Sequence, residues 1–200
     1  MARIAPLNAA APPDIAEKLG PVRAMLGFVP NSTLIMARHP KLLEAFQQLA
    51  MAALGPGKVP PDLKIMIGHV ASRAAGCRYC MAHTAHIAER RSVAAEKIEA
   101  LWDYERSPLF SPGERAALAF AQAAASVPNA VSDSDYDELK KHFDEDQIVE
   151  MLGVVALYGF LNRWNDSLAT PLEEQPCAFA ERHLGAAGWS AGKHGGPHGS

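Results

Sequence analysis

The chain has 200 residues and a formal net charge of -3 at pH 7, with 48% hydrophobic and 20% charged residues. These proportions are typical of a soluble globular protein, and they exclude a disordered chain. At this length one domain buries a sizeable core without disulfide staples. The weakly acidic balance also argues against nucleic acid as a partner, because nucleic-acid-binding domains carry basic patches.

The sequence contains no segment typical of a membrane protein. The longest apolar run, residues 151–161, is far shorter than the ~20 residues that span a bilayer. The first residues lack a continuous apolar region before Pro12, so we expect no secretory signal, no membrane and a cytoplasmic location. In a reducing compartment, two close cysteines are expected to be catalytic or metal-binding rather than a permanent disulfide.

In chain order, the sequence predicts helices and almost nothing else. The first opens at Pro13 and ends near Gly20, and Ser111 with Glu114 starts another as a capping box. The segment 77–91 either begins a new helix after Gly76 or continues the preceding one past a kink. Because alternating strand patterns are missing, the fold class is predicted to be all-α. Further helices are predicted over residues 32–40, 41–54, 61–76, 93–105, 111–127, 132–143 and 144–169.

Two Pro-led helical stretches, near 61–76 and 111–127, resemble each other weakly, so residues 1–172 are predicted to form one domain of two related helical halves. The tail 173–200 is Gly-rich at its end and lacks periodicity, so we expect it to be flexible or peripheral. Its histidines, His194 and His198, are interpreted as part of a solvated tail, with adventitious metal binding as the alternative, and the lone Cys177 as uninvolved in chemistry.

The apolar stripe of the helix predicted over 144–169 is too rich for a monomer of this size to cover. We therefore expect a homo-oligomer with this helix near the contact. The polar and aromatic residues 162–166 directly after the apolar run have two interpretations, a pocket lining or an oligomer contact. The contact is favoured, because tryptophan and arginine are enriched at interfaces.

Residues 77–86, CRYCMAHTAH, are the part of the sequence that carries chemistry. A zinc site is one interpretation, but four ligands within one short helical span point to different sides, and no second CxxC follows. We therefore expect neither a metal nor another cofactor. If Cys77 lies at the mouth of a helix, Cys80 is one turn away and a disulfide can close between them. The alternative is that both are small buried hydrophobic residues.

A redox couple is the interpretation that the spacing favours. A thiolate near a helix N-terminus is stabilised by free amide groups, and an imidazole on the same face, such as His83, lowers its pKa or accepts its proton. One cysteine then attacks an electrophilic oxygen or sulfur, and the other resolves the product to a disulfide.

GCRYCMAHTAH and the preceding LKIMIGHVASRAA resemble the carboxymuconolactone decarboxylase and alkylhydroperoxidase D superfamily, in particular its CxxC-containing peroxidase-related branch. HPKLLEAFQQL at 39–49 and LNRWNDSLATPLEE at 161–174 extend the resemblance over roughly residues 20–175. It implies an all-helical fold of helical hairpins, a homo-oligomer, and reduction of hydroperoxides through the cysteine pair. It also implies a reducing partner protein, either a lipoylated adaptor or a thioredoxin-like protein.

Residue by residue, the resemblance makes Cys80 the peroxidatic thiol and Cys77 the resolving one. The family's histidine position is Thr84 here, so His83 is the chosen histidine and His86 the reserve. The family's relay glutamate falls on Ile65. His69 is the candidate substitute, since a continuous helix would place it on the face of Cys80; the alternative is an ordinary core histidine.

Three functions remain open at this point. The first is a thiol-dependent peroxidase with peroxiredoxin activity, acting on organic hydroperoxides or hydrogen peroxide. The second is a cofactor-free lactone decarboxylase or tautomerase of the carboxymuconolactone type, in which the cysteines are idle. The third is a non-enzymatic helical oligomer that senses oxidants through the same couple.

Overall fold

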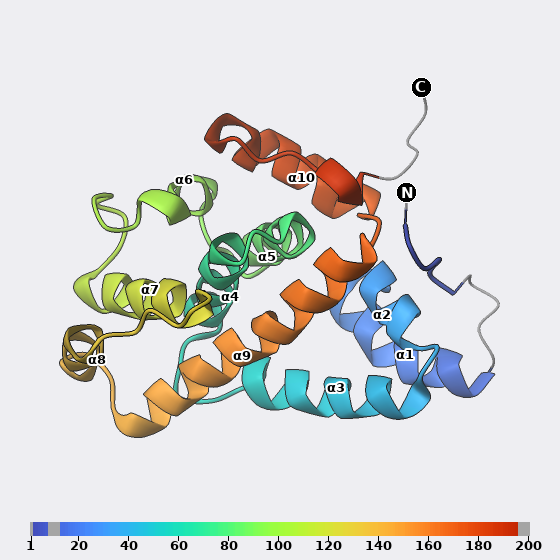
Figure 1. The fold of residues 1–200 in the computed structure, drawn as a ribbon, viewed down its shortest axis with the longest axis horizontal. Coiled ribbons are helices and arrows are strands. Elements are labelled where there is room, and N and C mark those ends of the chain that lie inside the picture. The colour runs from blue at the N-terminus through green and yellow to red at the C-terminus, as the bar shows by residue number, and fades with distance from the viewer. Residues whose placement is uncertain (1, 8–12, 196–200) are drawn as a thin grey trace.

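The fold is seen in a computed structural model that describes residues 2–7 and 13–195. The described residues are helical and contain no β-strand, so the all-α prediction is confirmed (Figure 1). The helices are α1 Pro13–Leu26, α2 Asn31–Met36, α3 Pro40–Leu54, α4 Pro61–Ala74, α5 Arg78–Arg90, α6 Ala95–Glu99, α7 Pro112–Ala125, α8 Asp133–Lys140, α9 Glu145–Leu168 and α10 Glu174–Leu184, with short 3-10 turns at Ala100–Asp103, Gly185–Ala187 and Gly192–His194.

Several helices begin where side chains cap the first turn. The Ser111 hydroxyl oxygen accepts from the Glu114 amide, and the Glu114 carboxylate accepts from the Ser111 amide. The predicted capping box is therefore confirmed at the start of α7. Asp144 caps α9 in the same way with Gln147. These caps satisfy amide groups that a helix start otherwise leaves without partners.

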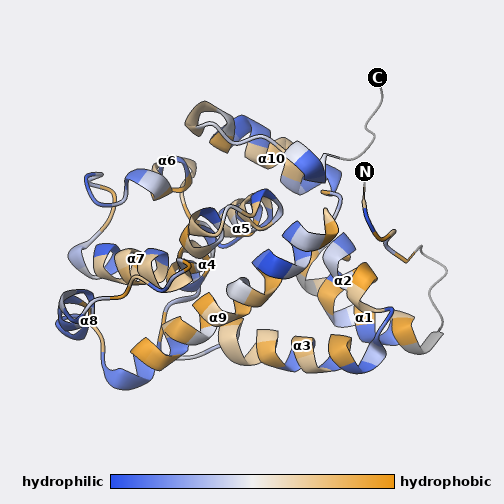
Figure 2. Cartoon of the chain, in the orientation of Figure 1, coloured by the Kyte–Doolittle hydropathy of each residue, from blue (hydrophilic) through white to orange (hydrophobic). Residues whose placement is uncertain are grey.

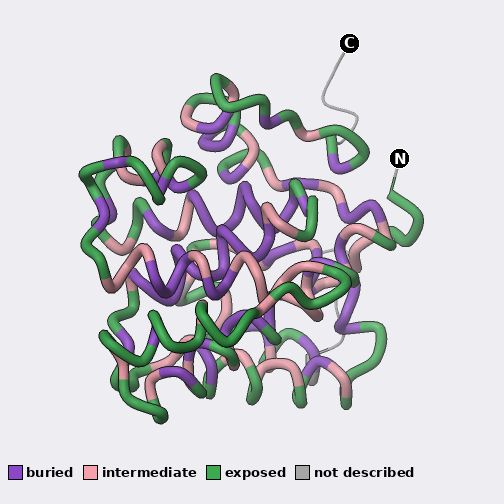
Figure 3. The backbone as a smooth tube through the Cα atoms, turned by 60° about the vertical axis from the view of Figure 1, so that its left-hand side comes forward, coloured by how far each residue is buried: buried purple, intermediate pink, exposed green. Residues whose placement is uncertain are grey.

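Helix α4 forms the centre of the molecule. It is buried from Leu63 to Ser72 and packs against α5, α7 and α9 (Figures 1 and 3). A Cβ atom on Gly68 would lie 2.2 Å from Cε2 of Tyr158, so this glycine is what allows α4 and α9 to approach so closely. The apolar residues of α9 run along its length (Figure 2), and its C-terminal part meets a second, smaller core formed by α1, α2 and α3.

One ion pair is embedded in this packing. The ammonium group of Lys64 on α4 is fully buried, contacts the carboxylate of Glu150 on α9, and donates to the Gly55 carbonyl at 2.6 Å. Glu150 also accepts the amide of Lys58 at 2.9 Å and that of Val59 at 3.1 Å. The pair thus fixes the loop after α3 against α9.

Two boundaries correct the sequence predictions. Helix α1 does not end near Gly20 but continues through Pro21 to Leu26. Pro21 has no amide N–H, so α1 lacks one backbone hydrogen bond there, but the helix continues. In addition, α9 is not the last helix, since α10 follows it.

The expectation of a flexible or peripheral tail is also wrong for residues 173–195. Helix α10 lies against α5 (Figure 1), and Phe179, Ala180, Leu184 and Trp189 belong to the main core. The apolar residues of α10 are few and widely spaced, so periodicity alone did not reveal them. His194 is 1% exposed, whereas His198 lies outside the described residues.

Among the described residues, no helix has both the length and the hydropathy that crossing a bilayer requires.

Candidate active site

The two cysteines of CRYC lie at the start of α5. Helix α4 ends at Ala74, Gly76 turns the chain with a φ of +75°, and Cys77 is the N-cap of α5. The Cys80 amide donates to Cys77 Sγ at 3.5 Å. Both thiols are free, and Cys77 and Cys80 are 0% and 3% exposed. The sequence alternative in which a new helix begins after Gly76 is therefore the one observed.

The electrostatics of the two thiols differ. The hydrogen bond from the Cys80 thiol lowers the pKa of Cys77, against the effect of burial, and the Cys80 amide lowers it further. Burial raises the pKa of Cys80 well above its usual range, and the hydrogen bond to Cys77 raises it more. Within the resting pair, Cys77 is thus the more acidic thiol, as expected for a sulfur at a helix N-cap.

His83 lies on the next turn of α5 and is paired with an acid. Its Nε2 atom is 2.6 Å from Oε2 of Glu173, and both side chains are largely buried. The Tyr79 hydroxyl donates to Oε1 of the same carboxylate at 3.0 Å, and the Asn31 amide donates to it as well. The Tyr79 ring stacks on the His83 ring with centroids 4.3 Å apart.

Glu173 keeps its negative charge in this setting. Burial acts to raise the pKa of its carboxyl, but the charge and hydrogen bond of His83 and the Asn31 amide outweigh burial and lower the pKa. Burial raises the pKa of Tyr79 well above its usual value, so the phenol stays a donor. The arrangement is a carboxylate–histidine pair beside a dithiol.

Sequence reasoning missed Glu173. The position of the family's relay glutamate falls on Ile65, a core residue at 1% exposure, so the sequence was interpreted as lacking this acid. Glu173 instead comes from the connection between α9 and α10, in the segment taken for a loose tail. No spacing within the CxxC region indicates a residue that the chain brings back from so far away.

His69 lies near the cysteine helix, but not through a continuous helix. The break at Gly76 removes the helical-rotation argument for its position. Its Nδ1 is 2.9 Å from Oγ1 of Thr84, which donates to the Cys80 carbonyl at 2.8 Å. Burial lowers the pKa of His69 to about 4, so the ring is neutral near pH 7. A relay role for His69 stays a prediction.

His86, the reserve histidine, packs among aromatic rings. Its ring centroid is 6.3 Å from that of Phe28 and 5.9 Å from that of Phe179. Phe28 also contacts His83, with centroids 5.9 Å apart. Within residues 2–7 and 13–195, no group of three or more His, Cys, Asp or Glu side chains is placed to hold a metal ion.

The end of α9 reaches the cysteines, which the favoured interpretation of residues 162–166 as an oligomer contact did not anticipate. The alternative, a pocket lining, describes Arg163 and Trp164. The Asn165 amide group donates to Cys80 Sγ at 3.5 Å. The negative charge of the Asp166 carboxylate acts to raise the pKa of both thiols. An asparagine and an acid of α9 therefore belong to the thiol site.

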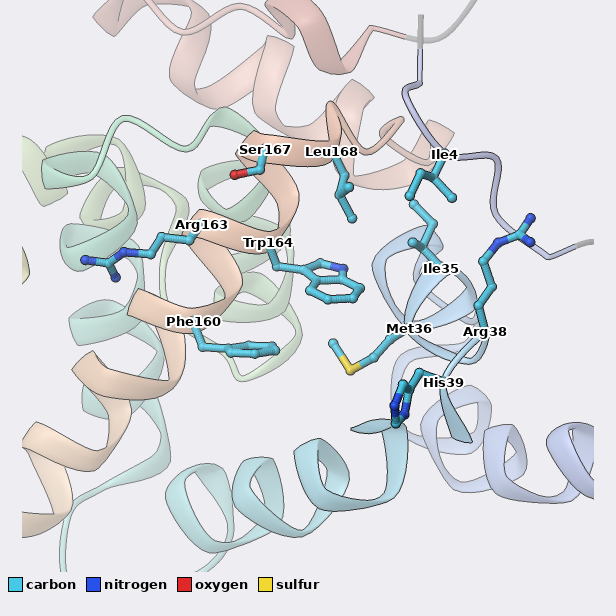
Figure 4. A pocket seen from close by; sticks show the side chains of 10 residues that line it. All are labelled: Ile4, Ile35, Met36, Arg38, His39, Phe160, Arg163, Trp164, Ser167 and Leu168. Atoms are coloured by element: carbon cyan, nitrogen blue, oxygen red, sulfur yellow. The ribbon is translucent and has the colours of Figure 1, made fainter. Parts of the chain in front are cut away.

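A separate apolar pocket of about 550 Å³ lies between α2, α9 and the N-terminal segment (Figure 4). The indole of Trp164 projects into the gap between α9 and α2, beside Met36 and Phe160. Neither cysteine lines this pocket. Its lining consists of Ile4, Ile35, Met36, Arg38, His39, Phe160, Arg163, Trp164, Ser167 and Leu168.

Comparison with known proteins places this fold in one class. The chain superposes on the debrominase Bmp8 with a TM-score of 0.83 and 34% identity, covering 89% of this chain and 96% of that one. A cysteine-to-alanine variant of Bmp8 in complex with 2,3,4-tribromopyrrole gives a TM-score of 0.84 at the same identity. A peroxidase-related protein from Ralstonia eutropha JMP134, described as an alkylhydroperoxidase AhpD core, shares the fold at 24% identity, with a TM-score of 0.74 over 90% of this chain and 95% of that one.

The all-α class defined by these structures is the AhpD-like fold. The sequence model of the carboxymuconolactone decarboxylase family matches residues 40–123, and the chain belongs to that family. The resemblance seen in the sequence is thereby confirmed. The Escherichia coli K12 protein YnjA is 32% identical over 97 residues, a match that covers 48% of this chain and 53% of YnjA. The chain thus matches only about half of the length of this relative.

Proposed function

We propose that this protein is a thiol-dependent peroxidase that reduces hydrogen peroxide or organic hydroperoxides through Cys77 and Cys80. The observation that carries the proposal is the dithiol at the start of α5 with the His83–Glu173 pair one turn further on. Superfamily members are enzymes, and their names include peroxidase-related proteins and a debrominase. The thiols supply a nucleophile, and the carboxylate-paired His83 supplies a proton carrier.

The reaction proceeds in two balanced steps. A thiolate attacks one oxygen of the hydroperoxide, so an S–O bond forms, the O–O bond breaks, and the leaving alkoxide or hydroxide takes a proton from His83. The second thiol then attacks the sulfenic acid, so a disulfide forms and water leaves. Sulfur loses two electrons, and the peroxide gains them.

The resting thiolate is assigned to Cys77 on the pKa directions, whereas the family resemblance assigns the attack to Cys80. The N-cap position and the Cys80 thiol stabilise negative charge on Cys77. The catalytic role of each cysteine remains part of the proposal. A dithiol-bearing protein, lipoylated or thioredoxin-like, is the proposed source of electrons for the disulfide.

The test is a titration of free thiols before and after one equivalent of hydrogen peroxide, followed by mass spectrometry. Wild-type protein should lose two thiols per chain and gain a Cys77–Cys80 disulfide within seconds. Cys177→Ser is the control, because Cys177 is outside the pair and should leave this loss unchanged. Retention of both thiols after prolonged exposure would remove the peroxidase proposal.

Reductive dehalogenation is the second candidate, favoured by 34% identity to the debrominase Bmp8 over nearly its whole length. The same pair can attack the halogen of a bromoarene, so an S–Br bond forms and the ring carbon takes a proton. The second thiol then displaces bromide and closes the disulfide. Incubation with 2,3,4-tribromopyrrole and a dithiol reductant, with bromide release as the readout, distinguishes this activity from peroxide reduction.

A further inference from the structure

A group of buried polar atoms at the C-terminal end of α9 lacks hydrogen-bond partners within the described part of the chain. The residues that carry them are at most 3% exposed. Burying such an atom without a partner costs about 1–3 kcal/mol, so a cluster of them is unusual in a folded protein. The atoms are Asn162 Nδ2 and Oδ1, Asn165 Oδ1, Thr170 Oγ1 and His194 Nε2.

His194 reaches this place because the chain after α10 folds back over the start of α5. The indole N–H of Trp189 donates to the Arg78 carbonyl at 3.2 Å, and the Arg78 guanidinium donates to the Ser190 carbonyl at 3.1 Å. The Leu172 amide donates to the His194 carbonyl at 2.8 Å. Residues 185–195, which we call the strap, thus cross the start of α5 at Arg78.

The hydrogen bonds of His194 fix which ring nitrogen is free. Its Nδ1 is 2.8 Å from the Thr170 carbonyl, which can only accept, so Nδ1 carries the proton. In the neutral ring, Nε2 therefore presents a lone pair. The charged groups that face the ring are Asp166, with Oδ1 at 3.6 Å from Nε2, and Lys193, which is paired with Asp166 at 2.7 Å. The Tyr79 ring is the other neighbour, at 5.9 Å between centroids.

One residue of the cluster, Asn165, contacts a thiol directly. The side-chain amide N–H of Asn165 donates to Cys80 Sγ at 3.5 Å, and its Oδ1 has no hydrogen-bond partner among the described residues. The Thr170 amide donates to the Asn165 carbonyl at 3.1 Å, and Thr170 in turn holds His194. Asn162 is one helical turn before Asn165, on the same face of α9. Asn165 thus links the cluster to Cys80, and Thr170 and His194 are joined to Asn165 by hydrogen bonds.

We propose that this cluster is the subsite that binds the peroxide group of the substrate. His194 Nε2 accepts the hydroperoxide O–H, and the Asn162 amide donates to the second oxygen, so the O–O bond is held beside Cys80. The subsite therefore takes Cys80 as the attacking thiol, as the family resemblance implies, and Cys77 as the resolving one. A peroxide group suits the cluster because it offers one donor and two acceptor oxygens in a compact unit. The proposal rests on the peroxidase function proposed above, and His194 acts in it as a binding residue.

The test compares two electrophiles on wild type and on His194→Asn. Asparagine keeps a donor near the Nδ1 position, and so the bond to the Thr170 carbonyl, but it lacks Nε2. We expect the second-order rate constant of thiol oxidation by hydrogen peroxide to fall at least tenfold. The rate with an aromatic disulfide reagent, which has no O–H group, should stay within twofold. His142→Asn, on the far side of the molecule at the end of α8, is the matched control.

Two results would overturn the subsite. One is an unchanged peroxide rate, and the other is an equal loss with both reagents, which would mean that His194 acts on the thiols or only holds the strap. Failure of the peroxidase function itself looks different, because wild type would then react with the disulfide reagent and not with peroxide.

Asn162→Leu provides a second variant in case His194→Asn does not fold. Leucine removes two unpartnered polar atoms at similar size, so we expect the temperature of half-unfolding to rise while the peroxide rate falls. A lower unfolding temperature with an unchanged peroxide rate would show that Asn162 has only a structural role, and the proposal would fail.

Discussion

Nε2 of His83 lies 2.6 Å from the carboxylate of Glu173, a residue 90 positions further along the chain. This contact joins the helix that carries the cysteines to the connection between α9 and α10. A carboxylate on one ring nitrogen fixes the orientation and tautomer of a histidine and stabilises its charged form. In the proposed peroxidase, Glu173 is therefore a positioning residue for the proton that His83 delivers.

Glu173→Gln should slow peroxide-driven thiol oxidation by about 10²-fold, the scale of a lost acid–base contribution. Glutamine can still hydrogen-bond to Tyr79 and Asn31, so the fold should persist. Stopped-flow oxidation at several pH values measures both the rate and the pH profile, and the profile should change because the variant removes the buried carboxylate charge of Glu173. Glu174→Gln, the exposed neighbour, serves as the control. An unshifted profile together with a wild-type rate would exclude Glu173 from the mechanism.

The two cysteine variants should behave differently towards peroxide. If Cys77 attacks, Cys77→Ser abolishes rapid peroxide consumption, whereas Cys80→Ser reacts once and stops at a sulfenic acid that a dimedone-type probe traps. If Cys80 attacks, as the family resemblance implies, the two results exchange. Peroxide consumption by both variants at the wild-type rate would argue against any role of the pair.

His69 should make the protein sensitive to mild acid. Burial holds the pKa of His69 at about 4 in the folded state, below the 6.5 of the unfolded chain. Between these two pH values, His69 is protonated in the unfolded state but not in the folded state. Stability should therefore fall as pH decreases from 6.5 towards 4, by about 3 kcal/mol from this residue.

Urea unfolding at pH 7 and pH 4.5 measures this loss. His69→Gln removes the titrating group, so its unfolding free energy should change less between the two pH values than that of wild type. An equal change in both proteins would show that other groups cause the acid sensitivity. The peroxide rate of the folded variant at pH 7 tests the relay role, which predicts a slower reaction.

Glu150 should be essential for stability, because it is the counter-charge of the fully buried Lys64. Glu150→Ala leaves an ammonium group inside the core without a counter-charge, and we expect a loss of about 3–5 kcal/mol of unfolding free energy. Asp146→Ala removes an exposed partner of Lys58, at 2.5 Å, and should cost no more than about 1 kcal/mol. Urea denaturation of both variants provides the comparison, and similar losses would contradict the importance of burial.

The exposed apolar residues of α9 should mediate self-association. Val149 is 71% exposed and Leu152 is 47% exposed, and exposed Leu49 lies on the neighbouring α3. We expect an oligomer at micromolar concentration by light scattering, and Leu152→Glu should reduce its mass because a carboxylate would be buried in the contact. A wild-type monomer would contradict this prediction.

The local features of the site followed from the sequence. Gly76 indicated either a helix start at Cys77 or a kink, and the CxxC spacing put both thiols within one turn in either case, because helix geometry depends only on neighbouring residues. The same local rules predicted the capping box at Ser111 and the all-α class. The family resemblance rested on the same short segments.

Only the tertiary structure decided what surrounds the thiols. Asn165 reaches Cys80, Glu173 reaches His83, and His194 reaches Tyr79 from segments far along the chain. The fold, not spacing, sets such contacts. The tail was misjudged because Phe179, Leu184 and Trp189 are too few for a clear apolar period, yet each fills a space beside α5. Packing free energy depends on the shape that a residue meets, and a linear sequence records the residue without that shape.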